Sequence, residues 1–125
     1  MSKSLKILVV EDEKVLNSAY KTILEKTGHE VEIAFDGEEA LSVLDQFLPD
    51  VILLDLKMPN LDGLGFLRAY EKIKPKKRSR IVLFSNYDLQ KEIDEAFKLG
   101  IDKYVLKAWA SPKELVRMVE EILNK

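Results

Sequence analysis

Five short apolar runs alternate along this chain with five segments whose apolar residues recur at helical spacing. The runs occupy residues 6–10, 31–35, 51–54, 81–84 and 104–106. Such alternation predicts parallel strands joined by right-handed helical crossovers, with helices covering both faces of a single sheet. We therefore expect an α/β fold.

The composition of the runs indicates the order of the strands. Four of them are almost purely apolar, as is typical of strands covered on both faces, whereas run 31–35 carries Glu32 among apolar residues and suits a sheet edge. This favours strand order 2-1-3-4-5 in a flavodoxin-like, doubly wound sandwich of five parallel strands and five helices. At 125 residues, the chain has the size of one domain, which we assign to 1–125.

Two helix starts carry capping signals. Asp36 is followed three residues later by Glu39, and Ser111 is followed by Pro112 and Glu114. Both patterns predict an N-cap with a capping-box partner, and proline is favoured at the first helical position.

Composition excludes several classes of function. The chain has no cysteine and one histidine, His29, so thiolate chemistry and Cys- or His-rich metal sites are excluded. A net charge of −2 gives no reason to expect direct nucleic-acid binding, and no apolar run approaches the roughly 20 residues that cross a membrane. We expect a cytoplasmic location.

Acidic residues follow two of the predicted strands directly. Glu11 and Asp12 follow run 6–10, and Asp55 follows run 51–54. In the predicted order these strands are neighbours, about 4.8 Å apart, and their carboxyl ends meet at the switch point of the sheet. Three carboxylates that close together would repel one another, and a bound Mg²⁺ or Mn²⁺ would remove the conflict.

The same edge collects groups suited to phosphoryl transfer. Carboxylates can attack phosphorus, which makes Asp55 the candidate nucleophile. Ser85 follows the fourth run and Lys107 the fifth. A hydroxyl and an ammonium there would stabilise charge on phosphoryl oxygens.

Four stretches resemble the receiver domain of two-component response regulators, the family that includes the single-domain chemotaxis regulators. They are Val-Val-Glu-Asp-Glu at 9–13, Leu-Leu-Asp-Leu-Lys-Met-Pro at 53–59 with Asp62-Gly63, Phe84-Ser85, and Gly-Ile-Asp-Lys-Tyr-Val-Leu-Lys at 100–107. The resemblance implies that Asp55 accepts a phosphoryl group from a sensor histidine kinase or a phosphotransfer protein. It also implies that Glu11, Asp12, Asp55 and the backbone carbonyl of Lys57 hold Mg²⁺.

The resemblance further implies a switch. Ser85 would move toward the phosphoryl group, Lys107 would be its cationic partner, and Tyr104 would swing inward. The surface of the fourth helix, fifth strand and fifth helix would then change and contact a downstream effector or a second copy. The chain would catalyse only its own phosphorylation and dephosphorylation, and we do not expect it to be an enzyme in any wider sense.

The chain departs from the family pattern at two positions. Ala108 stands where the family usually has proline after the lysine, often preceded by a cis bond. Because a cis bond to a non-proline residue costs about 2.5–4 kcal/mol, we predict a trans bond or local strain. Asn86, where a small residue is usual, would either hydrogen-bond a phosphoryl oxygen or crowd it. The resemblance also implies that Lys57 and Tyr87 occupy positions that, in this family, tune the lifetime of the phosphorylated state.

Three alternatives stay open. A degenerate receiver would bind partners without phosphorylation, although its acid set is intact. A haloacid-dehalogenase-like phosphatase would need Asp-x-Asp, and Asp55-Leu-Lys57 lacks the second acid. A flavodoxin-like cofactor binder would need a Gly/Ser/Thr-rich phosphate loop, whereas Glu11-Asp12-Glu13 would repel phosphate unless a metal were bound.

Overall fold

The computed structural model describes residues 4–123, which form one parallel sheet in the order β2-β1-β3-β4-β5. Its strands are β1 (Lys6–Val10), β2 (Glu30–Ala34), β3 (Val51–Leu54), β4 (Arg80–Ser85) and β5 (Lys103–Leu106). Its helices are α1 (Lys14–Lys26), α2 (Gly37–Phe47), α3 (Gly63–Ile73), α4 (Gln90–Lys98) and α5 (Pro112–Ile122), with a 3-10 turn η1 (Lys107–Trp109) after β5. The predicted fold class and strand order are confirmed.

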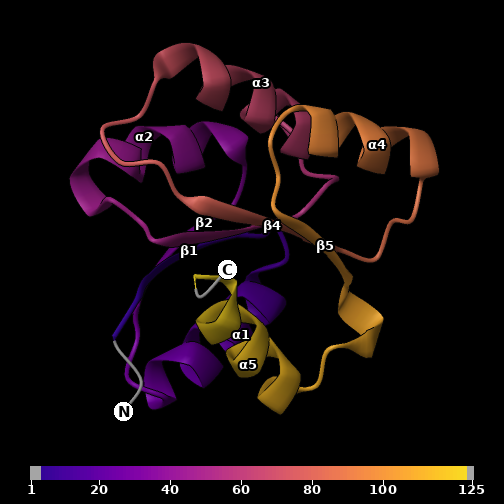
Figure 1. Ribbon diagram of the computed structural model, residues 1–125. Helices are drawn as coiled ribbons and strands as arrows, with labels where there is room; N and C mark the ends of the chain where they lie inside the picture. Colours follow the sequence, from indigo (N-terminus) through magenta and orange to yellow (C-terminus); the bar gives the residue numbers. More distant parts are fainter. Residues whose placement is uncertain (1–3, 124–125) are drawn as a thin grey trace.

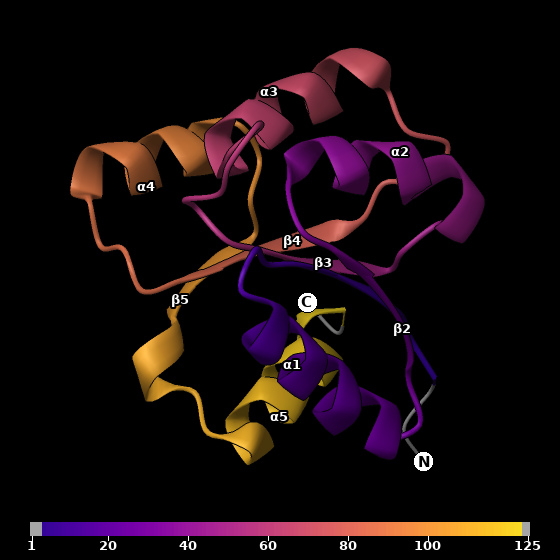
Figure 2. The same cartoon turned by 180° about the vertical axis from the view of Figure 1, so that it is seen from behind.

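The helices form two layers on opposite faces of the sheet. Helices α2, α3 and α4 cover one face, and α1 and α5 cover the other (Figures 1 and 2). Successive side chains of a strand point to opposite faces, so Leu8 and Ile52 join the core under the first group of helices, while Val9 and Leu53 join the second core. Both faces are therefore packed, and the strand ends are free to carry polar groups.

The two edge strands differ from the central ones. Strand β2 exposes Glu30 and Glu32, as expected of an edge. Our expectation that the fifth strand would be fully covered is wrong, because Lys103 is exposed and residues 104–106 are only half buried. The reason is topological: β5 has β4 as its single neighbour and is the other edge of the sheet.

Both predicted caps are present. The Asp36 carboxylate accepts a hydrogen bond from Glu39 N–H at 2.9 Å, and Ser111 forms a full capping box with Glu114. The Glu39 carboxylate accepts from Phe35 N–H at 2.7 Å, one residue before the expected position. Helices α2 and α5, which follow β2 and β5, are thus anchored at their starts by capping residues of their own sequence.

A buried histidine links both ends of the described chain. His29 Nδ1 accepts a hydrogen bond from Leu5 N–H at 3.1 Å, so the ring proton lies on Nε2, which donates to Glu120 at 2.9 Å. This contact ties the start of β1 to α5. Within residues 4–123, no helix has both the length and the apolar character to cross a bilayer.

Candidate acidic site at the carboxyl edge of the sheet

Strand register brings the predicted acids together. Val10 pairs with Leu54, so the residues that follow them leave neighbouring strands at the same level. The backbone ladder continues one step further, with Asp55 N–H donating to Val10 carbonyl oxygen at 3.1 Å and Glu11 N–H donating to Ala34 carbonyl oxygen at 3.0 Å. Glu11 and Asp55 are therefore held by main-chain hydrogen bonds that the register dictates.

The carboxylates of Glu11, Asp12 and Asp55 form one cluster. One oxygen from each lies within 4.8 Å of the others. Glu11 and Asp55 are buried, at 2% and 6% exposure, while Asp12 is exposed. Oxygens on opposite sides of one Mg²⁺ stand about 4.2 Å apart, so small side-chain rotations would let these three carboxylates bind a single cation. An all-oxygen donor set without imidazole or thiolate fits this ion.

Lys107 lies among the carboxylates. Its ammonium contacts Glu11 Oε1 and donates to Asp55 Oδ2 at 3.1 Å, and its side chain is only 8% exposed. Desolvation alone would lower the pKa of Lys107, but its contacts with Glu11 and Asp55 outweigh that effect and raise it. The lysine therefore stays charged. Burial raises the pKa of Glu11 by more than its contact with Lys107 lowers it.

Asn17 supports the cluster from α1 and was not foreseen from the sequence. It is fully buried, and its side-chain amide donates to the carbonyl oxygens of Glu11 at 2.9 Å and Ala34 at 3.0 Å. These bonds fix the backbone from which the Glu11 carboxylate extends. The available signal was an asparagine at helical spacing from Tyr20 and Leu24, on the buried face of the helix.

The loop after Asp55 is held from two sides. The side chain of Lys57 turns toward α4 and donates to both carboxylate oxygens of Glu92, at 3.0 and 2.9 Å. The hydrogen bond to the Glu92 carboxylate, more than the charge attraction to it, raises the pKa of Lys57. Gly63 N–H donates to Leu56 carbonyl oxygen at 2.9 Å, which brings the start of α3 against the backbone of Asp55.

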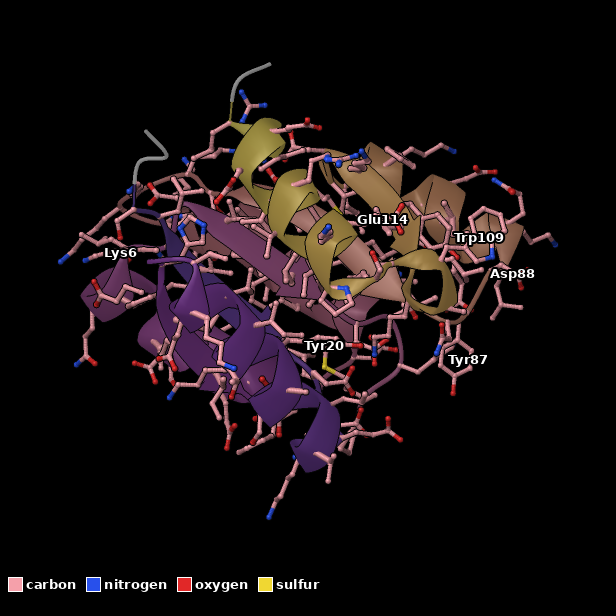
Figure 3. All side chains as sticks on the ribbon, turned by 90° about the horizontal axis from the view of Figure 1, so that it is seen from below. Lys6, Tyr20, Tyr87, Asp88, Trp109 and Glu114 are labelled. Atoms are coloured by element: carbon pink, nitrogen blue, oxygen red, sulfur yellow. The ribbon has the colours of Figure 1, made fainter. Side chains whose placement is uncertain are left out.

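A cavity of about 420 Å³ opens over the cluster. Its lining residues are Glu11, Asp12, Glu13, Asp55, Lys57, Asn86, Tyr87 and Lys107. Figure 3 shows that Tyr87, Asp88 and Trp109 lie together at one end of the molecule, whereas Lys6, at the start of β1, lies at the other. The cavity therefore occupies the carboxyl edge of the sheet, the edge at which the sequence placed Glu11, Asp12 and Asp55.

Ser85 and Tyr104 are close to the cavity without lining it. Ser85 is fully buried, and its hydroxyl oxygen accepts a hydrogen bond from Tyr87 N–H at 3.2 Å. The hydroxyl of Tyr104 donates to the carbonyl oxygen of the same Tyr87 at 2.9 Å. Both predicted switch residues thus hold the backbone of the loop between β4 and α4.

The two unusual positions contact each other. All peptide bonds of the described residues are trans, so the predicted trans bond between Lys107 and Ala108 is confirmed. Ala108 N–H donates to Asn86 Oδ1 at 2.9 Å. A proline at 108 would offer no such donor.

Comparison with known proteins finds similarity over nearly the whole chain. Residues 7–120 match the family described as response regulator receiver domain. Proteins named probable transcriptional regulator ycf27, from Guillardia theta and Porphyridium aerugineum, are each 38% identical over 96% of this chain and 46% and 48% of their own lengths. The chain thus spans about half the length of these curated relatives.

Solved structures show the same fold. A CheY-like receiver domain from Methanospirillum hungatei superposes with a TM-score of 0.88 at 27% identity, covering 98% of this chain and 95% of the other. The receiver domain of a Francisella response regulator superposes with a TM-score of 0.84 at 32% identity, covering 97% and 98%. The similarity therefore extends over the acidic edge as well as the sheet.

Proposed function

Because the chain belongs to the family of response regulator receiver domains, which are signalling domains of two-component systems, we propose that Asp55 is its phosphorylation site. The observation that carries the proposal is the position of Asp55 Oδ2. It lies in the cavity, 3.1 Å from the Lys107 ammonium and beside the carboxylates of Glu11 and Asp12. Its other oxygen, Oδ1, accepts a hydrogen bond from Leu56 N–H at 2.8 Å, which orients the carboxylate.

The proposed reaction is transfer of a phosphoryl group from a phosphohistidine to Asp55. A carboxylate oxygen attacks phosphorus, the new O–P bond forms, and the N–P bond of the donor breaks. The leaving imidazole nitrogen keeps the electron pair and takes a proton from water. Lys107 offsets negative charge on the phosphoryl oxygens as they approach.

The residues present fit a divalent cation. Glu11, Asp12, Asp55 and the main-chain carbonyl of Lys57 would hold Mg²⁺, with Mn²⁺ as a substitute. When bound, the ion supplies positive charge against which the phosphoryl oxygens are neutralised. The Lys57 ammonium is drawn away to Glu92, so it does not compete for the same oxygens.

Phosphorylation would be read through the α4–β5–α5 face. The modification adds roughly −1.5 to −2 charge and three acceptor oxygens, which would draw the hydroxyl of Ser85 and the Lys107 ammonium. Ser85 and Tyr104 both contact the backbone of Tyr87, so movement of that loop alters the packing of Tyr104. We propose that this face then contacts an effector or a second copy.

Several features support an interaction there. Phe97 of α4 is 48% exposed and Trp109 is 77% exposed, and β5 is a half-exposed edge strand. The phosphodonor would be a sensor histidine kinase or a phosphotransfer protein, and we propose a cytoplasmic location. Membership in a signalling family supports activity limited to the domain's own phosphorylation and dephosphorylation.

Intact mass spectrometry tests the assignment. The protein is incubated with Mg²⁺ and acetyl phosphate, and a gain of about 80 Da is expected for one phosphoryl group. Asp55→Asn should abolish the gain, whereas Asp88→Asn, at an exposed aspartate near the same edge, should keep it. An unmodified wild-type protein, or a modified Asp55→Asn variant, would overturn the assignment.

A further inference from the structure

Asn86 stands immediately beyond the last paired residue of β4. Ser85 lies opposite Leu106 in the parallel ladder, so Asn86 and Lys107 each directly follow the last pair of facing residues. Asn86 is exposed and lines the same cavity as Asp55 and Lys107. Asn86 therefore borders the space that a phosphoryl group on Asp55 would enter.

The orientation of the amide is determined by Ala108. A backbone N–H can only donate, so the Asn86 atom that contacts it, at 2.9 Å, must be the carbonyl oxygen Oδ1. The –NH₂ group, Nδ2, is therefore the other end of the amide. Within residues 4–123, the Asn86 side chain makes one hydrogen bond to the protein, the one from Ala108 N–H, so Nδ2 stays available to a further acceptor.

The charges of the cavity favour a neutral donor. Besides the exposed Glu13, three carboxylates and two lysines line the cavity. Both lysines already form ion pairs. Lys107 pairs with Glu11 and Asp55, and Lys57 pairs with Glu92. An amide adds two N–H groups without competing for these carboxylates as a further cation would. Phosphoryl oxygens are strong acceptors, and hydrogen bonds to charged acceptors are about twice as strong as neutral ones.

We propose that Asn86 is a phosphoryl-binding residue of this domain. Its Nδ2 donates a hydrogen bond to an oxygen of the phosphoryl group on Asp55, and Ala108 N–H holds the amide in the donating orientation. The proposal rests on phosphorylation of Asp55. The hydrogen bond from Ala108 N–H is what fixes the amide, since a proline at 108 would have no N–H to donate and would leave the amide free to rotate.

Nuclear magnetic resonance gives a direct readout. The wild-type protein, labelled with ¹⁵N, is titrated with beryllium trifluoride, a phosphoryl mimic, in the presence of Mg²⁺. The side-chain –NH₂ signals of Asn86, identified by their loss in Asn86→Asp, should shift downfield on saturation. An Asn86 signal that stays unmoved when the site is saturated overturns the proposal.

Affinity for the same mimic provides the second readout. Asn86→Ala should bind about tenfold more weakly, the loss of one hydrogen bond to a charged group. Asn86→Asp keeps an acceptor for Ala108 N–H but presents a carboxylate to the phosphoryl oxygens, so it should bind more weakly still. Gln90→Glu adds the same charge on the first turn of α4, outside the cavity lining, and should bind like wild type.

Two outcomes distinguish a failure of the proposal for Asn86 from a failure of the proposal that Asp55 is phosphorylated. A wild-type protein that gains no phosphoryl mass from acetyl phosphate contradicts phosphorylation of Asp55 itself. A protein that is phosphorylated normally, but in which Asn86→Ala binds the mimic as tightly as wild type or more tightly, contradicts only the role of Asn86. Tighter binding of the mimic by Asn86→Ala than by wild type would mean that the Asn86 side chain crowds the phosphoryl group.

Discussion

Replacing Gly63 with alanine tests how the start of α3 supports the phosphorylation site. A Cβ at Gly63 would lie 2.5 Å from the carbonyl oxygen of Asp55 and 3.0 Å from Leu56 Cα. Ordinary van der Waals contact begins at 3.4 Å, so the first contact must open by 3.4 − 2.5 = 0.9 Å. Both partners are backbone atoms, so the helix start and the Asp55 backbone must move apart.

Gly65 offers a matched control on the same helix turn. A Cβ there would lie 2.5 Å from Leu61 Cδ1, the end of a flexible side chain that can rotate away. Both substitutions gain up to about 1 kcal/mol of helix propensity, so this gain cancels in the comparison. Forced overpacking costs about 1–3 kcal/mol, and we expect Gly63→Ala to be less stable than Gly65→Ala by about that amount.

Urea unfolding measures the stability difference, and the initial rate of Asp55 phosphorylation by acetyl phosphate measures its consequence for the site. A misplacement near 1 Å can cost about 100-fold in rate, so a shift approaching 0.9 Å should slow Gly63→Ala by about tenfold or more, with Gly65→Ala near wild type. Equal stabilities and equal rates for the two variants would refute the reasoning.

Three further predictions concern contacts elsewhere. Replacing Lys107 with methionine should tighten Mg²⁺ binding measured by calorimetry, because in the wild-type protein the Lys107 ammonium is paired with the Glu11 and Asp55 carboxylates that would bind the ion. An unchanged affinity for Mg²⁺ would contradict this. Asp36→Ala should cost about 1–2 kcal/mol at pH 7 in urea unfolding. The pKa of Asp36 is lowered from 3.8, first by the hydrogen bond from Glu39 N–H and then by Asn60. The carboxylate therefore adds stability above about pH 3.8 that is lost as pH falls through the lowered pKa, and this variant should lose less stability there than wild type. His29→Phe keeps the buried volume but loses both ring hydrogen bonds, to Leu5 and Glu120, and should lower the unfolding free energy by about 2 kcal/mol. A decrease in unfolding free energy below about 0.5 kcal/mol would contradict a stabilising role for these hydrogen bonds.

Most of the fold could be predicted from local sequence signals. Strand and helix periods depend on which residues are apolar, and the caps at Asp36 and Ser111 depend on groups within three residues, so both could be predicted without knowing the rest of the structure. The position of Asp55 at the carboxyl edge followed from the same alternation. Strand β5 was misjudged because three apolar residues look alike in a central strand and at an edge.

The detailed contacts of the site came only from tertiary structure. Sequence placed Lys107 at the edge but not between Glu11 and Asp55, since its position depends on the register of the four strands β1, β3, β4 and β5 and on a side-chain rotamer. The hydrogen bond from Asn17 to the Glu11 carbonyl oxygen and the one from Ala108 N–H to Asn86 likewise join residues from separate loops and helices. Composition and period determined that oxygen ligands and an ammonium would share one edge of the sheet. Packing over long sequence distances decided which atoms meet there, because hydrogen bonds depend on fractions of an ångström that no local pattern encodes.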